Sequence, residues 1–185
     1  MNNYKLALKA IIGYLIAVLL LTYPLIINIS HSIYGIPHDN FGTLWDLWAY
    51  HTAIQNKIPF NSFDYINYPY GVNITPSIKM FTSYNFNFIT SYLIPNAYFA
   101  YNLITITKFI FASYSMFLLL KLLNIKVVVA WVGGCIYAFN PFMISLALAY
   151  GPNFISVFLP LLVFCFINFI HKKNITSLAL MIITT

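Results

Sequence analysis

Residues 6–28 read LALKAIIGYLIAVLLLTYPLIIN, a run that contains one lysine and no acidic residue. A helix needs about 20 mostly apolar residues to cross the hydrocarbon core of a bilayer, so this stretch predicts a first membrane span. A cleavable signal peptide would have a shorter apolar core that ends in a small-x-small site. The run ends instead in TYPLIINIS, and we therefore expect a helix that is retained in the membrane.

The composition of the whole chain agrees with this reading. Of its 185 residues, 61% are hydrophobic and 6% are charged, against about 25% charged residues in soluble domains. So few charges cannot cover a soluble fold, and we expect lipid to be the solvent for most of the surface. The net charge of +6 comes from lysines scattered at segment ends. This scatter favours anchoring beside anionic membrane lipid and indicates no nucleic-acid partner.

Further apolar runs predict an all-α, polytopic membrane protein with one transmembrane domain over residues 1–185. The expected spans are about 6–28, 96–123, 127–150 and 153–170, followed by a truncated fifth, 175–185. Asn140-Pro141 interrupts the third span and is expected to kink it and shape a cavity, because proline removes a backbone hydrogen bond. Cys135 and Cys165 lie in apolar runs and are interpreted as small core residues, not as a disulfide or metal pair.

An outer loop, residues 29–95, holds all three aspartates of a chain that has no glutamate. Within it, Asp39 to about Lys57 is predicted to be helical. Helical spacing puts one group of apolar residues on one face and a second, more polar group on the opposite face (Phe41, Leu44, Trp45 and Trp48 against Asp39, Thr43, Asp46 and Tyr50). Because tryptophan suits the membrane–water interface, we expect this helix to lie on the membrane with its acids pointing away from lipid.

The segment from Ile78 to Ile94 is apolar but contains several polar residues, and it could be interfacial, re-entrant or a true span. Positive charge favours the first choice. If this segment does not cross, every cationic cluster falls on one side of the membrane (Lys5, Lys9, Lys121, Lys126, His171, Lys172 and Lys173). The positive-inside rule then predicts a cytoplasmic N-terminus in the cytoplasmic membrane and an outer loop that holds every carboxylate.

Asp39 and Asp46 are the first candidates for chemistry. In the simplest interpretation, Asp39 caps the helix and Asp46 is a solvated residue on its polar face. In the catalytic interpretation, a carboxylate on the outer membrane surface acts as a general base on an acceptor hydroxyl, or Asp39 holds a divalent cation.

Several other residues are candidates for substrate binding. Lys108 is a charge inside a span, where it could bind the phosphate of a lipid-linked substrate unless its side chain snorkels to the interface. His38 and His51 flank the acids and could move protons, although surface histidines are common and their spacing matches no metal motif. Trp45, Tyr68 and Tyr70 could contact a sugar, although aromatic residues are also common in membrane-interface belts.

The order of these features resembles a known superfamily. The loop carries His38-Asp39-Asn40, Trp45 with Trp48, Pro59-Phe60 and Tyr68-Pro69-Tyr70-Gly71, and it is followed by NAYFAYNLITITKF, by GGCIYAFNPFMISLA and by a span with Pro160. This order is similar to that of C-type (GT-C) membrane glycosyltransferases, especially members akin to the protein mannosyltransferases. The family's glycine before the aspartate is His38 here, and its following proline is Asn40.

The resemblance implies a GT-C-like N-terminal half whose outer loop bears juxtamembrane helices. It implies transfer of a sugar from a polyprenyl-phosphate carrier outside the cytoplasmic membrane, with Asp39 as the catalytic residue and Asp46 as the second candidate. Because such enzymes have more spans and a soluble C-terminal domain, we expect this chain to be a fragment that lacks C-terminal spans or a partner membrane protein. The alternative functions are a non-catalytic membrane protein for lipid-linked sugar or polymer export and, ranked last, a small transporter, for which paired broken spans or repeats are absent.

Overall fold

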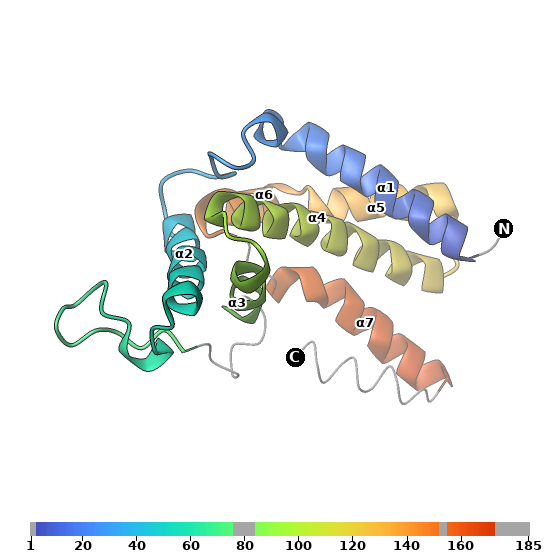
Figure 1. The fold of residues 1–185 in the computed structure, drawn as a ribbon. Coiled ribbons are helices and arrows are strands. Elements are labelled where there is room, and N and C mark those ends of the chain that lie inside the picture. The colour runs from blue at the N-terminus through green and yellow to red at the C-terminus, as the bar shows by residue number, and fades with distance from the viewer. Residues whose placement is uncertain (1–2, 76–83, 152–154, 173–185) are drawn as a thin grey trace. The chain divides into compact units, whose positions relative to one another are not determined.

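The computed structural model describes residues 3–75, 84–151 and 155–172, and this part of the chain is all-α, as predicted (Figure 1). Its only β-type pairing within these ranges is an isolated antiparallel bridge between Phe63 and Val72. The elements are α1 (Asn3–Leu21), the 3-10 helix η1 (Leu25–Ile27), α2 (Asn40–Asn56), the 3-10 helix η2 (Phe60–Ser62), α3 (Tyr84–Leu93), α4 (Ala97–Leu122), α5 (Val127–Ala138), α6 (Pro141–Ala149) and α7 (Ile155–Lys172).

Two of the described helices, α1 and α4, are long and apolar enough to cross a membrane, and a third candidate arises if α5 and α6 form one span. The axes of α5 and α6 differ by 43°, which confirms the break predicted at Asn140-Pro141. Helix α7 is apolar but shorter, over Ser156–His171. These helices support a membrane protein. The expected run 175–185 and the first part of Ile78–Ile94 lie outside the described residues, whereas the end of the latter forms α3.

The chain divides into two compact units. One comprises Met1–Thr22, Ile106–Ile144 and Phe154–Thr185, and we name it the lysine unit because it contains no acidic residue. The other comprises Tyr23–Thr105 and Ser145–Asn153, and we name it the aspartate unit because it contains all three aspartates.

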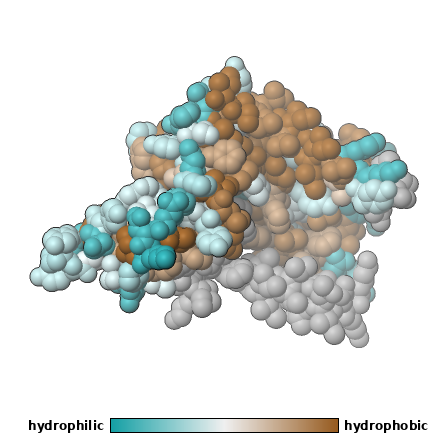
Figure 2. Space-filling model, in the orientation of Figure 1, coloured by the Kyte–Doolittle hydropathy of each residue, from teal (hydrophilic) through white to brown (hydrophobic). Residues whose placement is uncertain are grey.

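The lysine unit is built by close packing of α1 on α5 (Figure 1). The ring of buried Tyr14 stacks on Trp131 at a centroid distance of 5.4 Å, and its hydroxyl donates to the Trp131 carbonyl oxygen at 3.0 Å. Gly134 allows this approach, because a Cβ there would collide with the Tyr14 hydroxyl and the Ser113 carbonyl. Hydrophobic residues cover much of the visible surface over α1 (Figure 2). In this helix Ile16 and Leu20 are 54% and 73% exposed, as expected of a helix that faces lipid.

In the aspartate unit, α2 packs on α3. Tyr50 is only 4% exposed, and its ring meets the edges of Phe60 and Phe88. The predicted division of α2 into faces is therefore wrong, because Tyr50 was assigned to the solvated face, while Phe41 and Trp48 of the apolar face remain 52% and 41% exposed. Packing on α3 selects the buried face, and the spacing of apolar residues within α2 cannot reveal that partner. Hydrophilic residues gather over the loop that follows α2 (Figure 2).

Candidate functional site

Backbone and amide hydrogen bonds hold the approach to α2 in place. The side chain of Asn40 is fully buried, and its Nδ2 donates to the Leu148 carbonyl oxygen at 2.9 Å. The same oxygen accepts a hydrogen bond from the backbone N–H of Ile36 at 2.8 Å. Asn40 Oδ1 also accepts from the backbone N–H of His38 at 3.2 Å. Gly35 is required here, because a Cβ at this position would collide with the Asn40 amide.

These contacts place Asp39 on the surface, at the N-cap position directly before α2. Its backbone has helical dihedral angles of −60° and −18°, and its side chain makes no capping hydrogen bond with the described residues. The interpretation of Asp39 as a side-chain helix cap is therefore contradicted. Instead, its Oδ1 lies 3.4 Å from His38 Nδ1, with the two side chains 68% and 48% exposed.

The imidazole of His38 has a second neighbour, because its ring meets Tyr150 edge-on at a centroid distance of 5.2 Å. A carboxylate, an imidazole and a phenol thus lie together at the surface of the aspartate unit. Carboxylate and imidazole are the side chains that proteins use most often to accept and pass on protons.

Asp46 lies two helical turns after Asp39 and on the same side of α2, about 10 Å along the helix axis. It is partly buried, and burial raises the pKa of its carboxyl group to about 6. Over the ranges that the structure describes, no group forms a hydrogen bond or ion pair with this carboxylate. A carboxyl group that titrates so close to neutral pH is suited to general acid–base chemistry.

The structure does not bring the other predicted loop residues to Asp39. His51 Nδ1 lies 3.0 Å from the Ser91 carbonyl oxygen of α3, and it is about 18 Å along α2 from Asp39. The indole of Trp45 meets Phe63 edge-on at 6.1 Å, within the packing of α2 on the following loop. Tyr68 and Tyr70 are 82% and 84% exposed in that loop. We interpret His51 and Trp45 as packing residues and keep the two tyrosines as surface candidates.

Lys108 belongs to the lysine unit, and its side chain is 0% exposed. Its Nζ has no hydrogen-bond partner among the described residues. A snorkelling lysine would carry its ammonium group to the surface, so the snorkelling interpretation is contradicted.

Sequence reasoning missed the role of Asn102 in α4. Its Nδ2 donates to the carbonyl oxygens of Ile29 and Ser32 at 2.8 and 2.6 Å, and its Oδ1 accepts from the backbone N–H of Tyr34 at 3.1 Å. One amide therefore fixes the backbone that leads to the Asp39 turn. The signal was an asparagine inside an apolar helix, because a buried amide must find partners for both of its polar atoms.

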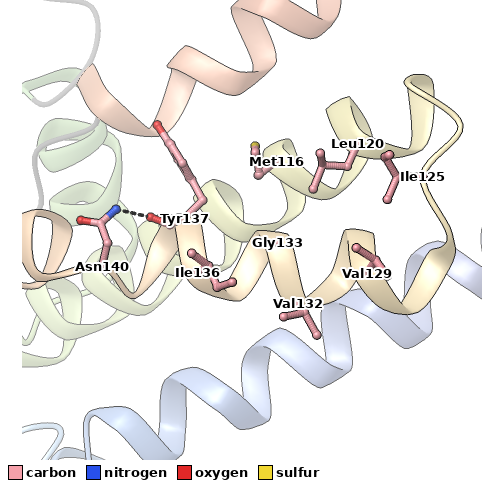
Figure 3. A pocket seen from close by; sticks show the side chains of 9 residues that line it. All are labelled: Met116, Leu120, Ile125, Val129, Val132, Gly133, Ile136, Tyr137 and Asn140. Carbon is pink, nitrogen blue, oxygen red and sulfur yellow. Dashed lines mark hydrogen bonds between the residues drawn. The ribbon is translucent and has the colours of Figure 1, made fainter.

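A groove of about 550 Å³ lies beside α4 and α5 in the lysine unit. Figure 3 shows its lining, which is apolar except near Tyr137 and Asn140, where the Asn140 Nδ2 donates to the Tyr137 carbonyl oxygen. The sequence predicts a cavity at the Asn140-Pro141 break, and Asn140 does line this groove. Its volume is in the range of small-molecule sites, and its hydrocarbon lining is suited to an apolar chain.

The divalent cation expected at Asp39 stays a prediction. The described ranges contain no group of three or more histidine, cysteine, aspartate or glutamate residues that could hold a metal ion. Asp39 and His38 would provide two protein ligands, and water or a substrate phosphate would complete the shell of a divalent cation there. Cys135 and Cys165 are free thiols.

Comparisons of the chain with protein-family models, with curated proteins and with solved structures found no match.

Proposed function

We propose that this chain is a membrane glycosyltransferase of the GT-C type, or its N-terminal part. It transfers a sugar from a polyprenyl-phosphate carrier to an acceptor on the outer side of the cytoplasmic membrane. The observation that carries the proposal is the exposed Asp39 carboxylate, which is anchored by the buried Asn40, makes no helix cap and lies 3.4 Å from the His38 imidazole. A structural carboxylate at this position would be expected to use its oxygen atoms on the free N–H groups of the helix.

In the proposed reaction, an acceptor hydroxyl oxygen attacks the anomeric carbon of the donor sugar while its proton passes to the Asp39 carboxylate. The bond between the anomeric carbon and the phosphate oxygen breaks, and the polyprenyl phosphate leaves with the electron pair. His38 is close enough to Asp39 to take the proton onward to solvent. A correctly positioned general base contributes about 10²–10⁴-fold to such a rate.

The setting of the aspartate unit also supports the proposal. Helices α2 and α3 lie in the chain between the two clear span candidates, α1 and α4. They contain 17 and 10 residues, so α2 is about 25 Å long and α3 about 15 Å. Short helices between spans suit a reaction at the membrane surface, where a lipid-borne sugar meets an acceptor from water.

The test is a transfer assay in membranes that contain the full chain, with radiolabelled polyprenyl-phosphate mannose, glucose and galactose as donors. We expect Asp39→Asn to lower transfer at least about 100-fold, because asparagine keeps the shape and cannot accept the proton. The matched control is Asp64→Asn, which removes the exposed aspartate of the following loop and should leave transfer unchanged.

Equal transfer by wild type and Asp39→Asn would contradict the proposal. Binding of a donor without transfer by the wild type would favour the non-catalytic alternative, a membrane protein that carries lipid-linked sugar for export.

A further inference from the structure

Lys108 is the buried charge that the proposed reaction does not use. It is the twelfth residue of α4, about 16 Å along the helix from Ala97, and therefore lies well inside a candidate span. Its side chain is 0% exposed, and its Nζ atom has no hydrogen-bond partner among the described residues. Lys121 of the same helix is different, because its Nζ donates to the Ile125 carbonyl oxygen at 3.0 Å.

The chain cannot supply a side-chain counter-charge at this position from the described residues. Asp39 and Asp64 are exposed, and Asp46 forms no ion pair. The remaining residues, 1–2, 76–83, 152–154 and 173–185, contain no aspartate or glutamate in their sequence. On the buried face of α4, one and two turns after Lys108, stand Ala112 and Ser115, and the Ser115 hydroxyl already donates to the Phe111 carbonyl oxygen.

A desolvated ammonium group is unfavourable in a protein interior or in lipid unless an anion accompanies it. Intramembrane lysines therefore mark sites that bind or move charged groups. No aspartate forms an ion pair with Lys108 in the described residues. Its Nζ lies 5.9 Å from the centroid of the Phe109 ring, which provides no negative charge, so an accompanying anion would come from another molecule. Lipid phosphates are anions that every membrane supplies, and lysine binds phosphate as a point charge.

We propose that Lys108 is an anion-binding residue inside the membrane domain and that it binds the phosphate group of a lipid. The proposed function determines only which lipid this is, namely the polyprenyl-phosphate carrier. The alternative source of the same chemistry is the phosphate of an ordinary phospholipid headgroup, such as phosphatidylglycerol.

The test measures lipid binding to the full chain in nanodiscs made of an uncharged glycolipid that contains no phosphate, with labelled undecaprenyl phosphate as the probe and undecaprenol as its neutral counterpart. We expect wild type to bind the phosphate at least about tenfold more tightly than the alcohol. The variant Lys108→Met, which keeps the length and loses the charge, should bind both equally, and Lys108→Arg should restore the preference. Lys121→Met is the matched control and should behave as wild type.

Competition distinguishes the two sources. If undecaprenyl phosphate stays bound in an excess of phosphatidylglycerol, the site is specific for the carrier. If phosphatidylglycerol displaces it, Lys108 binds the phosphate of phospholipid headgroups. Equal binding of phosphate and alcohol by wild type would overturn the inference without any variant. An unchanged phosphate preference in Lys108→Met would also overturn the inference. If that variant also lost self-association, the partner of Lys108 would be the carboxylate of a second protein.

The two proposals fail separately. Asp39→Asn should bind undecaprenyl phosphate as wild type does, so retained transfer in that variant contradicts the catalytic proposal and leaves the Lys108 site standing. Loss of transfer in Asp39→Asn, together with wild-type phosphate binding by Lys108→Met, would support the catalytic proposal and contradict the Lys108 site.

Discussion

The two units of the chain differ in what holds them together. The lysine unit contains no acidic residue, and small residues such as Gly134 let Tyr14 of α1 pack closely against α5. The aspartate unit relies on buried amides, because Asn40 and Asn102 tie loop backbone to helices through hydrogen bonds. Close packing of small residues is the usual solution among helices in lipid, where no hydrophobic effect drives association. Buried amide side chains whose donor and acceptor atoms are hydrogen-bonded can instead hold irregular loops and thereby position functional side chains.

The largest effect is expected from a test of close packing in the lysine unit. Gly134→Ala adds a Cβ that would collide with the Tyr14 hydroxyl and the Ser113 carbonyl, and we expect a loss of about 3 kcal/mol in unfolding free energy. The measurement is thermal unfolding in detergent. Gly42→Ala is the control, because nothing lies within 4 Å of a Cβ at that helical position, and it should stabilise by up to about 1 kcal/mol. Equal unfolding temperatures for the two variants would contradict the packing account.

A test of the amide network in the aspartate unit comes next. Asn40→Ala removes the hydrogen bonds to the Leu148 carbonyl and the His38 backbone N–H from a fully buried position. We expect a loss of about 2 kcal/mol, together with reduced transfer, because Asp39 loses its anchor. Denaturant unfolding and the transfer assay check the two effects. Asn61→Ala, at an exposed position, should change neither. Unchanged stability and transfer in Asn40→Ala would contradict the role of the buried amide.

The pH dependence of Asp46 gives a smaller effect. Burial raises its pKa from 3.8 to about 6 in the folded protein, so the native state holds this proton more tightly than the unfolded chain does. The resulting contribution to stability is present below about pH 4 and is lost as the pH rises through about 6. Asp46→Asn should therefore be more stable than wild type by about 1 kcal/mol at pH 8, with solvent screening taken into account, and equal to it near pH 4. The measurement is the unfolding temperature of wild type and of Asp46→Asn between pH 4 and pH 8. A difference between the two proteins that does not change with pH would contradict the burial of Asp46.

The smallest effect is expected at the exposed loop aromatics. Tyr68→Ala should change the unfolding free energy by less than about 0.5 kcal/mol, because the side chain is 82% exposed. If Tyr68 contacts the sugar, the variant should raise KM in the transfer assay and leave the unfolding temperature unchanged. A large drop in unfolding temperature would instead assign this residue to the packing of the aspartate unit.

The sequence predicted the helices well where a long apolar run defines them. The predicted run 96–123 corresponds to α4 at Ala97–Leu122, and the helix predicted from Asp39 to about Lys57 corresponds to α2 at Asn40–Asn56. The first apolar run was predicted too long, because α1 ends at Leu21 and the residues up to Asn28 form a turn and η1. Proline at position 24 cannot continue the helix with a backbone hydrogen bond.

Contacts between segments could not be predicted in the same way. The buried face of α2 depends on α3, and the surroundings of Asp39 depend on Leu148 and Tyr150, more than 100 residues later in the chain. His38 and Asp39 are neighbours in the sequence, so their proximity follows from the chain itself. The burial of Asn40 against the Leu148 carbonyl of α6 could not be predicted from the sequence. Single-chain periodicity reports the pattern within one helix and does not identify its partner.

We propose that Asp39 faces the outer side of the cytoplasmic membrane and that Lys126 faces the cytoplasm. The most direct test is cysteine labelling in a Cys135→Ser, Cys165→Ser background with a membrane-impermeant maleimide on intact cells. We expect Asp39→Cys to be labelled from outside and Lys126→Cys to be labelled only after the cells are permeabilised. Labelling of Lys126→Cys in intact cells, with protection of Asp39→Cys, would place the aspartates in the cytoplasm and contradict the account.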